Sequence, residues 1–443
     1  MFSGTRDRNP KAVLQDCARK FVLATNGWPV FRSAYRGAYR LAAHQVGRLA
    51  LSHAGIAALY ARNSYATGLW SPGRSDIDLT VVWRAPSHRE IARFNRDYAS
   101  LRRRFPMLGE VEMIDTRHIE AWTAYGFTGL QSRHWLKLCG DHDFESRYEG
   151  DESIDRLRHA IAVYRWQFLR YFWERSCPEH QLQRVASKVL RILGSSESVR
   201  RAPSDLLSLC LSEISSAVDR VAPAECGEVV DCSRMLNPTP RPPLWSKMVV
   251  HAAEVDAVIG LRRDPTSRHV LIRPATDIRK IESEFRGAVV LDRKSFLFYL
   301  THVDCLEYFT LLQERTILHG IDPLGGESTL RADVLRETVC QYSVDMLTFP
   351  YQENLDRIPA SQFQDLLYGW FLRTLRYFED GVMEFDYYAL RSHFGERHPE
   401  ELDRFALLRG IASEVSHHLS SRGHGRDPVG QGPREELISA RSN

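Results

Sequence analysis

The feature that most constrains this chain is a short apolar run that begins with two acidic residues, SDIDLTVVW at residues 75–83. Its β-branched residues, and the proline-terminated segment that follows, predict a strand ending near residue 83. Along a strand, side chains two positions apart share a face. Asp76 and Asp78 therefore project together, while the residues between and after them point into a core. A turn that contains glycine, residues 63–73, comes directly before the strand.

The neighbouring segments extend this strand into a mixed α/β unit. Apolar residues recur at helical spacing over residues 35–62 and again over residues 87–105, and GEVEMID at residues 109–115 predicts a second strand. The order helix, strand, helix, strand predicts a small mixed sheet covered by helices, up to about residue 148.

The rest of the chain divides by composition and periodicity. A length of 443 residues predicts two to four units, each with its own core. The fold class expected is mixed α/β (α+β), in which the first unit is followed by helical domains and by a candidate degenerate second copy of the first unit. The predicted units are the first unit at 1–148, a helical domain at 149–221, a proline-rich linker at 222–246, the candidate copy at 247–325, a helical domain at 326–420 and a polar, disordered tail at 421–443.

Short echoes between the halves motivate the second copy. The segment WLKLCGDHDF at 135–144 is similar to TILHGIDPL at 316–324. Apolar runs also resemble one another by chance, so an unrelated second half stays open. In a true copy the acidic pair would be lost, because Arg268 and His269 stand near the positions where carboxylates are expected. The second half would then be a structural partner.

Composition argues against several classes of protein. The formal net charge of +3 gives no overall electrostatic case for binding nucleic acid. The eight cysteines include no CxxC pair, which argues against a zinc site or a disulfide framework. No apolar run is long enough to span a bilayer, and no apolar h-region follows the first charged residues. We therefore expect no membrane role and a cytoplasmic location.

The acidic pair and the turn before it are suited to a metal ion and a phosphate. Two carboxylates this close repel each other unless a cation lies between them. Mg²⁺ typically binds one or two carboxylates together with substrate phosphates. Ser64, Gly68 and the residues between them can offer a hydroxyl and backbone N–H groups to an anion. The plain alternative is that Asp76 and Asp78 form the solvated end of a strand.

This ordered combination resembles the nucleotidyltransferase signature of the DNA polymerase beta superfamily, especially its minimal and aminoglycoside-type members. The residues that carry the resemblance are Asn63-Ser64, Gly68, Pro72-Gly73 and the Asp-x-Asp strand at residues 75–79. The family usually has glycine where Asn63 stands. Asparagine is the next most tolerant residue of a positive φ, so the turn can form with it.

The resemblance implies a two-metal mechanism with Mg²⁺ or Mn²⁺, in which a nucleoside monophosphate is transferred from a nucleoside triphosphate and pyrophosphate leaves. It also implies a third carboxylate on a neighbouring strand, acting as metal ligand or general base. Glu112 is the expected residue and Glu110 is the alternative, because both lie on one face of the second strand. The expected catalytic residues and metal ligands are thus Asp76, Asp78 and Glu112.

The resemblance further implies a basic residue, supplied by the following helical domain, that holds the triphosphate. Lys188 and Arg184 lie on one side of a predicted helix by their four-residue spacing. Together with Ser64 and Gly68 they are the expected nucleotide-binding residues. A solvated basic stripe on a helix is the alternative interpretation.

The acceptor is left open by the resemblance. The nearly balanced charge favours a hydroxyl of a small molecule or of a protein over nucleic acid. One alternative is a non-catalytic nucleotide-binding or scaffold protein, motivated by Asn63 and by the altered second half. Another is transfer to RNA, which predicts a basic cleft built from the arginine-rich segments at 102–104, 156–170 and 262–273.

Overall fold

The computed structural model describes most of the chain from residue 21 to residue 422. The described ranges are 21–73, 75–148, 150–174, 177–195, 201–221, 229–232, 255–261, 268–273, 285–325, 329–352, 355–399 and 403–422. The predicted disordered tail lies outside the described residues from residue 423 onwards, and the predicted linker is described only at 229–232.

The first unit is a four-stranded mixed sheet with helices, as predicted. Its strands lie in the order β3-β2-β1-β4, with β2 parallel to β3 and the other pairs antiparallel. Its elements are α2 (Pro29–Leu51), β1 (Ile56–Ala61), α3 (Asn63–Ala66), β2 (Ile77–Trp83), α4 (His88–Arg104), β3 (Leu108–Asp115), α5 (Ile119–Ala124), α6 (Gly126–Ser132) and β4 (Leu136–Gly140).

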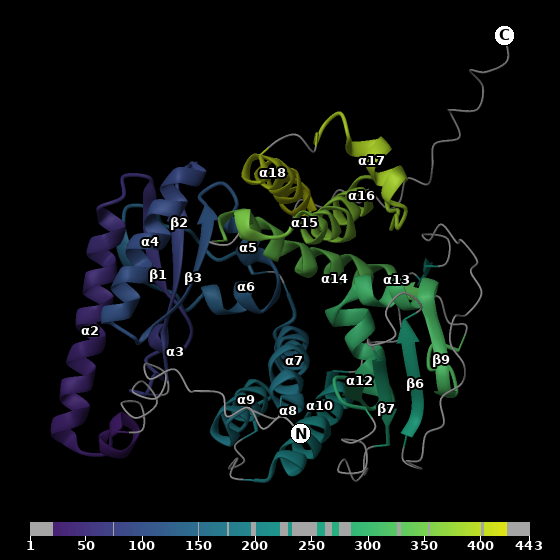
Figure 1. The fold of residues 1–443 in the computed structure, drawn as a ribbon, viewed down its shortest axis with the longest axis horizontal. Helices are drawn as coiled ribbons and strands as arrows, with labels where there is room; N and C mark the ends of the chain where they lie inside the picture. Colours follow the sequence, from purple (N-terminus) through teal and green to yellow (C-terminus); the bar gives the residue numbers. More distant parts are fainter. Residues whose placement is uncertain are drawn as a thin grey trace, which may run out of the picture.

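Local sequence explains why these elements form and which face they bury. Ile77 and Leu79 on β2 are fully buried, as the alternation predicts. Ser87 begins α4 with a capping box, because its side chain accepts from the Glu90 N–H and the Glu90 side chain accepts from Ser87. α2 contacts β1, β2, β4 and α4, and so covers one face of the sheet (Figure 1). The opposite face of the sheet carries the acidic pair and faces the rest of the molecule.

A helical segment follows the first sheet, and it contains no strand among its described residues, as predicted for 149–221. It consists of α7 (Glu152–Val163), the π-helical turn η1 (Tyr164–Leu169), α8 (Arg170–Trp173), α9 (Glu179–Ile192) and α10 (Pro203–Val221). The predicted linker contains a short strand, β5 (Val229–Asp231), which pairs with β10 (Thr329–Arg331) in the second half. In Figure 1 the helices of this segment lie between the two sheets.

The second sheet has the same topology as the first. Its order is β8-β7-β6-β9, with β7 parallel to β8 and the other pairs antiparallel. Its elements are β6 (Val255–Leu261), β7 (Arg268–Ile272), β8 (Val289–Leu291), α12 (Arg293–Phe298), η3 (Tyr299–Val303), α13 (Cys305–Glu314) and β9 (Arg315–Gly320).

The correspondence extends to the irregularities of the two sheets. In β1 the register shifts between Ile56 and Ala58, and in β6 it shifts between Val255 and Ala257. Gly140 ends β4 opposite Ala58, and Gly320 ends β9 opposite Ala257. Unrelated sheets would not share both the strand order and these shifts, so the two halves have the same sheet architecture.

The C-terminal segment is helical apart from β10, and it packs back onto the first unit. Its elements are α14 (Ala332–Val344), η4 (Asp345–Leu347), η5 (Phe349–Tyr351), η6 (Leu355–Arg357), α15 (Ala360–Leu366), η7 (Leu367–Phe371), α16 (Leu372–Asp380), α17 (Tyr387–Phe394) and α18 (Arg404–Arg422). α18 contacts α5 of the first unit, while α10 of the first half contacts α12 of the second (Figure 1). Helices of each half therefore contact helices of the other half.

Within the described part of the chain, none of the helices combines the length and the hydropathy that a membrane crossing needs.

Candidate functional site

The acidic pair lies at the beginning of β2, against the neighbouring strand β3. Asp76 is exposed and Asp78 is half-buried. Both lie against Gly109, since a Cβ added there would come within 2.5 Å of the Asp78 Oδ1 atom and 3.0 Å of the Asp76 Cβ atom. The two side chains thus occupy the space that a larger residue at position 109 would fill. Gly109 is what allows the two carboxylates to project side by side.

Asn63, the first residue of α3, holds Asp78. Its φ is +54°, in the left-handed region, so a residue tolerant of positive φ is needed where the family usually has glycine. The expectation that asparagine can form this turn is confirmed. Its side-chain amide also donates to the Asp78 Oδ2 atom at 2.7 Å, which glycine could not do. The substitution therefore adds an orienting contact to one of the two aspartates.

Glu112 lies on the same sheet face as the acidic pair. In the parallel register of β2 and β3, Glu112 is opposite Thr80. Thr80 is two residues from Asp78 on the same strand, so the two side chains share a face. Its carboxylate forms an ion pair with Arg62, whose side chain is 9% exposed, and Glu112 itself keeps 38% of its side-chain surface. Burial among the surrounding protein atoms raises the pKa of Glu112, against the lowering effect of Arg62. The third carboxylate therefore has a cationic partner within the protein.

Most of the backbone N–H groups that we expected to bind phosphate already donate hydrogen bonds within the α3 turn. The N–H groups of Ala66, Thr67 and Gly68 donate to the carbonyls of Arg62, Asn63 and Tyr65 at 3.4, 3.2 and 3.3 Å. Gly68 has a φ of +73°, so its contribution is to the path of the turn. The half-buried Ser64 begins this turn beside Asn63.

Lys188 reaches the same region from α9, more than 100 positions later in the chain. Burial lowers the pKa of Lys188, while the carboxylates of Asp78 and Glu110 act to raise it. The ammonium therefore lies within electrostatic range of both carboxylates. No ion pair joins Lys188 to any residue of the described ranges. Arg184, one turn earlier, is exposed. Lys188 is thus a cation close to the acidic pair with capacity for another anion.

The donor set suits a cation held by two carboxylates. Among the described residues, no group of three or more His, Cys, Asp or Glu side chains is arranged to hold a metal ion. Asp76, Asp78 and Glu112 share a face but do not gather into such a group, and Glu112 is paired with Arg62. Asp76 and Asp78 by themselves fit Mg²⁺, which completes its shell with water and phosphate oxygens.

Three residues of this region were not singled out from the sequence. Arg62 directly precedes Asn63 at the end of a strand, and Gly109 directly precedes Glu110, so both had weak local signals. Asp345 begins η4 in the second half, and Glu112 is the charged group that acts on it. Nothing in its sequence neighbourhood indicates this electrostatic effect, because 233 positions separate the two residues.

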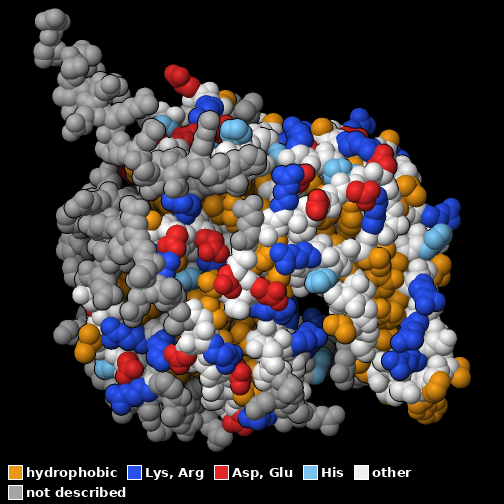
Figure 2. Space-filling model, turned by 180° about the vertical axis from the view of Figure 1, so that it is seen from behind, with side chains coloured by type: hydrophobic (Ala, Val, Ile, Leu, Met, Phe, Trp, Pro, Cys, Tyr) orange, Lys and Arg blue, Asp and Glu red, His pale blue; other side chains and the backbone are white. Residues whose placement is uncertain are grey.

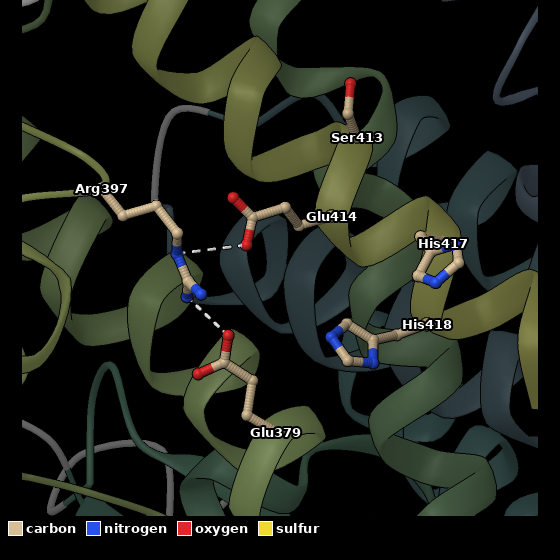
Figure 3. Close-up of a pocket in the computed structure, with 6 residues that line it drawn as sticks. All are labelled: Glu379, Arg397, Ser413, Glu414, His417 and His418. Atoms are coloured by element: carbon tan, nitrogen blue, oxygen red, sulfur yellow. Dashed lines mark hydrogen bonds and ion pairs between the residues drawn. The ribbon is translucent and has the colours of Figure 1, made fainter.

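The surface of the molecule is hollowed between the first unit and the remaining helices. Figure 2 shows this hollow with acidic and basic side chains at its rim. A separate pocket of about 400 Å³ lies between the C-terminal helices and is lined by Glu379, Arg397, Ser413, Glu414, His417 and His418 (Figure 3). There the Arg397 guanidinium bridges Glu379 and Glu414, so the pocket's main charges are paired with each other. It contains none of the residues described above.

Comparison with known families agrees with the geometry. A family model described as a nucleotidyltransferase domain matches residues 51–139, which include the turn, both aspartates and Glu112. The first sheet unit is a nucleotidyltransferase domain of the polymerase beta-like superfamily. Searches of curated proteins and of solved structures gave no match for the chain. The nucleotidyltransferase domain ends with β4, so the match says nothing of the second half.

The second sheet does not repeat the site of the nucleotidyltransferase domain. Its register places His269 where the first sheet has Thr80 and Val289 where it has Glu112. The residues that correspond in sequence to Asp76 and Asp78 fall within 262–267, outside the described residues. The predicted loss of the acidic pair therefore falls outside the described residues, whereas the counterpart of Glu112 is the apolar Val289.

Proposed function

We propose that this chain is a metal-dependent nucleotidyltransferase that moves a nucleoside monophosphate from a nucleoside triphosphate to a hydroxyl of a small molecule or a protein. The observation that carries the proposal is the placement of Asp76 and Asp78 side by side over Gly109, inside the segment matched by the nucleotidyltransferase family. This geometry places two carboxylates where they can share a cation, within electrostatic range of Lys188.

Each residue of the site has a role in this proposal. A Mg²⁺ or Mn²⁺ ion held by Asp76 and Asp78 would neutralise and align the phosphates of the donor. Asn63 orients the Asp78 carboxylate through its 2.7 Å hydrogen bond. Lys188 offers its ammonium to the phosphate chain, as a point charge suited to phosphate oxygens.

The reaction replaces one phosphorus–oxygen bond by another. The acceptor hydroxyl oxygen bonds to the α-phosphorus, the bond from that phosphorus to the bridging oxygen breaks, and pyrophosphate leaves with the bond's electron pair. The hydroxyl proton passes to a base. Glu112 lies on the correct face for this, but the Arg62 ion pair must open before Glu112 can act.

The geometry favours a small or protein acceptor over RNA. Arg158 pairs with Asp155 and Glu337 at 3.0 and 2.7 Å, and Arg165 pairs with Asp304 and Glu307 at 3.1 Å each. These arginines belong to the basic cleft that an RNA acceptor predicts, but carboxylates of the protein itself neutralise their charges. Residues 262–267 of the third segment lie outside the described ranges.

The non-catalytic alternative loses part of its support. It was motivated by Asn63, yet Asn63 takes the required positive φ and bonds Asp78. A half-buried carboxylate next to a second carboxylate also destabilises the protein unless a cation binds between them. The presence of both aspartates therefore favours a functional site.

The test is thermal stability with ATP, GTP, CTP or UTP, with and without Mg²⁺, for the wild type, Asp78→Asn and Asp143→Asn. A ligand that binds only the folded state at a hundredfold excess over its Kd stabilises that state by about 2.7 kcal/mol. We expect a Mg²⁺-dependent rise in Tm with at least one nucleotide, lost in Asp78→Asn. Asp143, whose side chain is 82% exposed, is the matched control and should keep the rise. The absence of any rise in the wild type would contradict the proposal.

A further inference from the structure

The two aspartates of the acidic pair differ in how the protein holds their backbone. Asp78 lies inside β2, where its carbonyl accepts from the Arg62 N–H at 2.8 Å and its side chain accepts from Asn63. Asp76 stands one residue before Ile77, the first residue of β2. Strand pairing therefore supports Asp78 on both sides, whereas the chain that enters Asp76 needs a support from outside the sheet.

The peptide units on either side of Asp76 are anchored by different parts of the fold. The Ile77 N–H donates to the Met107 carbonyl at 2.8 Å, which anchors the peptide unit that follows Asp76. The Tyr39 hydroxyl donates to the Ser75 carbonyl at 2.6 Å, which anchors the peptide unit that precedes Asp76. Because each peptide unit is planar, these two hydrogen bonds together limit the φ and ψ of Asp76, and so the direction of its side chain.

Packing fixes both the ring of Tyr39 and the turn that it binds. Tyr39 is a buried residue of α2, and its ring stacks on Trp70 with the ring centroids 4.6 Å apart. Trp70 in turn lies 5.6 Å from the ring of Tyr65. The Ser71 N–H donates to the Ser75 Oγ atom at 3.1 Å, which closes the turn just before Asp76. The Tyr39 hydroxyl is therefore a donor in a fixed place, because close-packed aromatic rings have little room to move.

A second buried tyrosine supports the strand against which the acidic pair lies. Tyr98 belongs to α4, which packs against α2 (Figure 1). Its hydroxyl donates to the Gly109 carbonyl at 3.0 Å. Both aspartates lie so close to Gly109 that an added Cβ there would come within 3.0 Å of each of them. The space for the two carboxylates therefore depends on the position of Gly109, which Tyr98 helps to fix.

We propose that Tyr39 and Tyr98 are positioning residues for the acidic pair. Each hydroxyl holds a backbone carbonyl next to the pair, so that the carboxylates of Asp76 and Asp78 point to one place and can share one cation. A site whose ligands are held in position before the ion arrives binds that ion more tightly. The inference rests on the proposed metal-dependent nucleotidyl transfer, and it adds two residues that set the affinity of the site for Mg²⁺.

The test uses Tyr39→Phe and Tyr98→Phe, which remove only the hydroxyl. The Tm is measured against Mg²⁺ concentration with one fixed concentration of ATP, GTP, CTP or UTP, and the readout is the Mg²⁺ concentration at half of the full rise. The nucleotide binds Mg²⁺ equally in every sample, so a difference in this midpoint reports the protein. We expect the midpoint to rise about fivefold in Tyr39→Phe, as the loss of one hydrogen bond would give. The rise should be about twofold in Tyr98→Phe, because Gly109 is also held by its place in β3.

The matched control is Tyr164→Phe. Tyr164 is fully buried, and its hydroxyl donates to the Val290 carbonyl at 2.8 Å, on β8 of the second sheet. This variant should lower the Tm without ligands, as the loss of a buried hydrogen bond does, and keep the wild-type midpoint. In Tyr39→Phe, high Mg²⁺ should restore the full nucleotide-dependent rise, because mass action compensates for a weaker site. A merely structural role for Tyr39 would instead lower the Tm equally at every Mg²⁺ concentration.

The outcomes separate this inference from the proposed function. A wild type that shows the Mg²⁺-dependent rise, with unchanged midpoints in Tyr39→Phe and Tyr98→Phe, would overturn the inference and leave the proposed function standing. A changed midpoint in only one of these variants would overturn the role of the other tyrosine. An equal change in Tyr164→Phe would also overturn the inference, because the effect would then follow from lost stability. Absence of any Mg²⁺-dependent rise in the wild type would overturn the nucleotidyl-transfer proposal itself, and this inference with it.

Discussion

The two sheets of this protein share a backbone and differ in chemistry. Both have one parallel and two antiparallel strand pairs, in the same order and with matching register shifts. On the equivalent face, Glu112 of the first sheet is replaced by Val289, and Thr80 by His269. By the same register, Leu261 stands where the first sheet has Arg62. One fold therefore carries an open acidic site in one half and none of those side chains in the other.

The charges of the second sheet unit are paired with one another and with an arginine from the first half. The buried His269 Nε2 atom lies 2.8 Å from the Glu307 Oε1 atom, and Arg165 joins Glu307 to Asp304. Burial acts to raise the pKa of Glu307, but His269 and Arg165 outweigh it and lower that pKa. In the first half, Lys188 forms no ion pair with a described residue, although it lies within electrostatic range of Asp78 and Glu110. A site that must bind ligands keeps charges unsatisfied, whereas a structural core satisfies them.

The comparison is tested most strongly by removing the arginine that pairs with the carboxylates of each sheet unit. Arg165→Met removes the cation shared by two carboxylates that are 12% and 16% exposed, and we expect a loss of about 3–5 kcal/mol in the free energy of unfolding. Arg62→Met strands Glu112, which is 38% exposed, and should cost about 1–2 kcal/mol. Urea denaturation of both variants measures the difference. Equal costs would mean that the two halves are not divided into structural and functional charges.

The shared backbone can be tested at the two glycines that end β4 and β9. Gly140 has a φ of +98° and Gly320 a φ of +75°, and a Cβ at either would overlap a backbone oxygen of the paired strand, that of Ala57 or Asp256. We expect Gly140→Ala and Gly320→Ala each to lower the free energy of unfolding by about 2–4 kcal/mol.

The matched control for these variants is Gly287→Ala. Gly287 has a φ of +85°, but an added Cβ would meet no atom within 4 Å, so its cost of about 1 kcal/mol reports backbone strain alone. If Gly320→Ala cost no more than this control, the equivalence of the two sheet ends would be refuted.

The smallest expected effect is at the turn that is particular to the first half. Asn63→Gly keeps the positive φ and removes the hydrogen bond to Asp78, so we expect less than about 1 kcal/mol of lost stability and a weaker affinity for Mg²⁺-nucleotide by a few fold. Asn63→Ala should cost more, because alanine disfavours this φ. Titration of the Tm against nucleotide concentration measures both variants. Tighter nucleotide binding in Asn63→Gly would mean that Asn63 holds Asp78 away from its ligand.

Much of the first unit could be predicted from the sequence, because its signals are local. The alternation around Ile77 and Leu79, the helical period of α4 and the Asp-x-Asp run each depend on residues only a few positions apart. The echo between 135–144 and 316–324 was short, yet it contains Gly140 and Gly320, which end matching strands. The position of the lost carboxylates was less accurate, since Arg268 and His269 correspond to Leu79 and Thr80, just after the acidic pair.

The sequence by itself determined the strand with its two aspartates, the helices around it and the nucleotidyltransferase family, because these depend on periodicity and on neighbours along the chain. The tertiary structure decided which charges meet. The Arg62–Glu112 pair joins residues 50 positions apart, and the Arg165–Glu307 pair joins the two halves of the chain. Electrostatic interactions act through space between side chains that packing brings together, and no local pattern of residues encodes that packing.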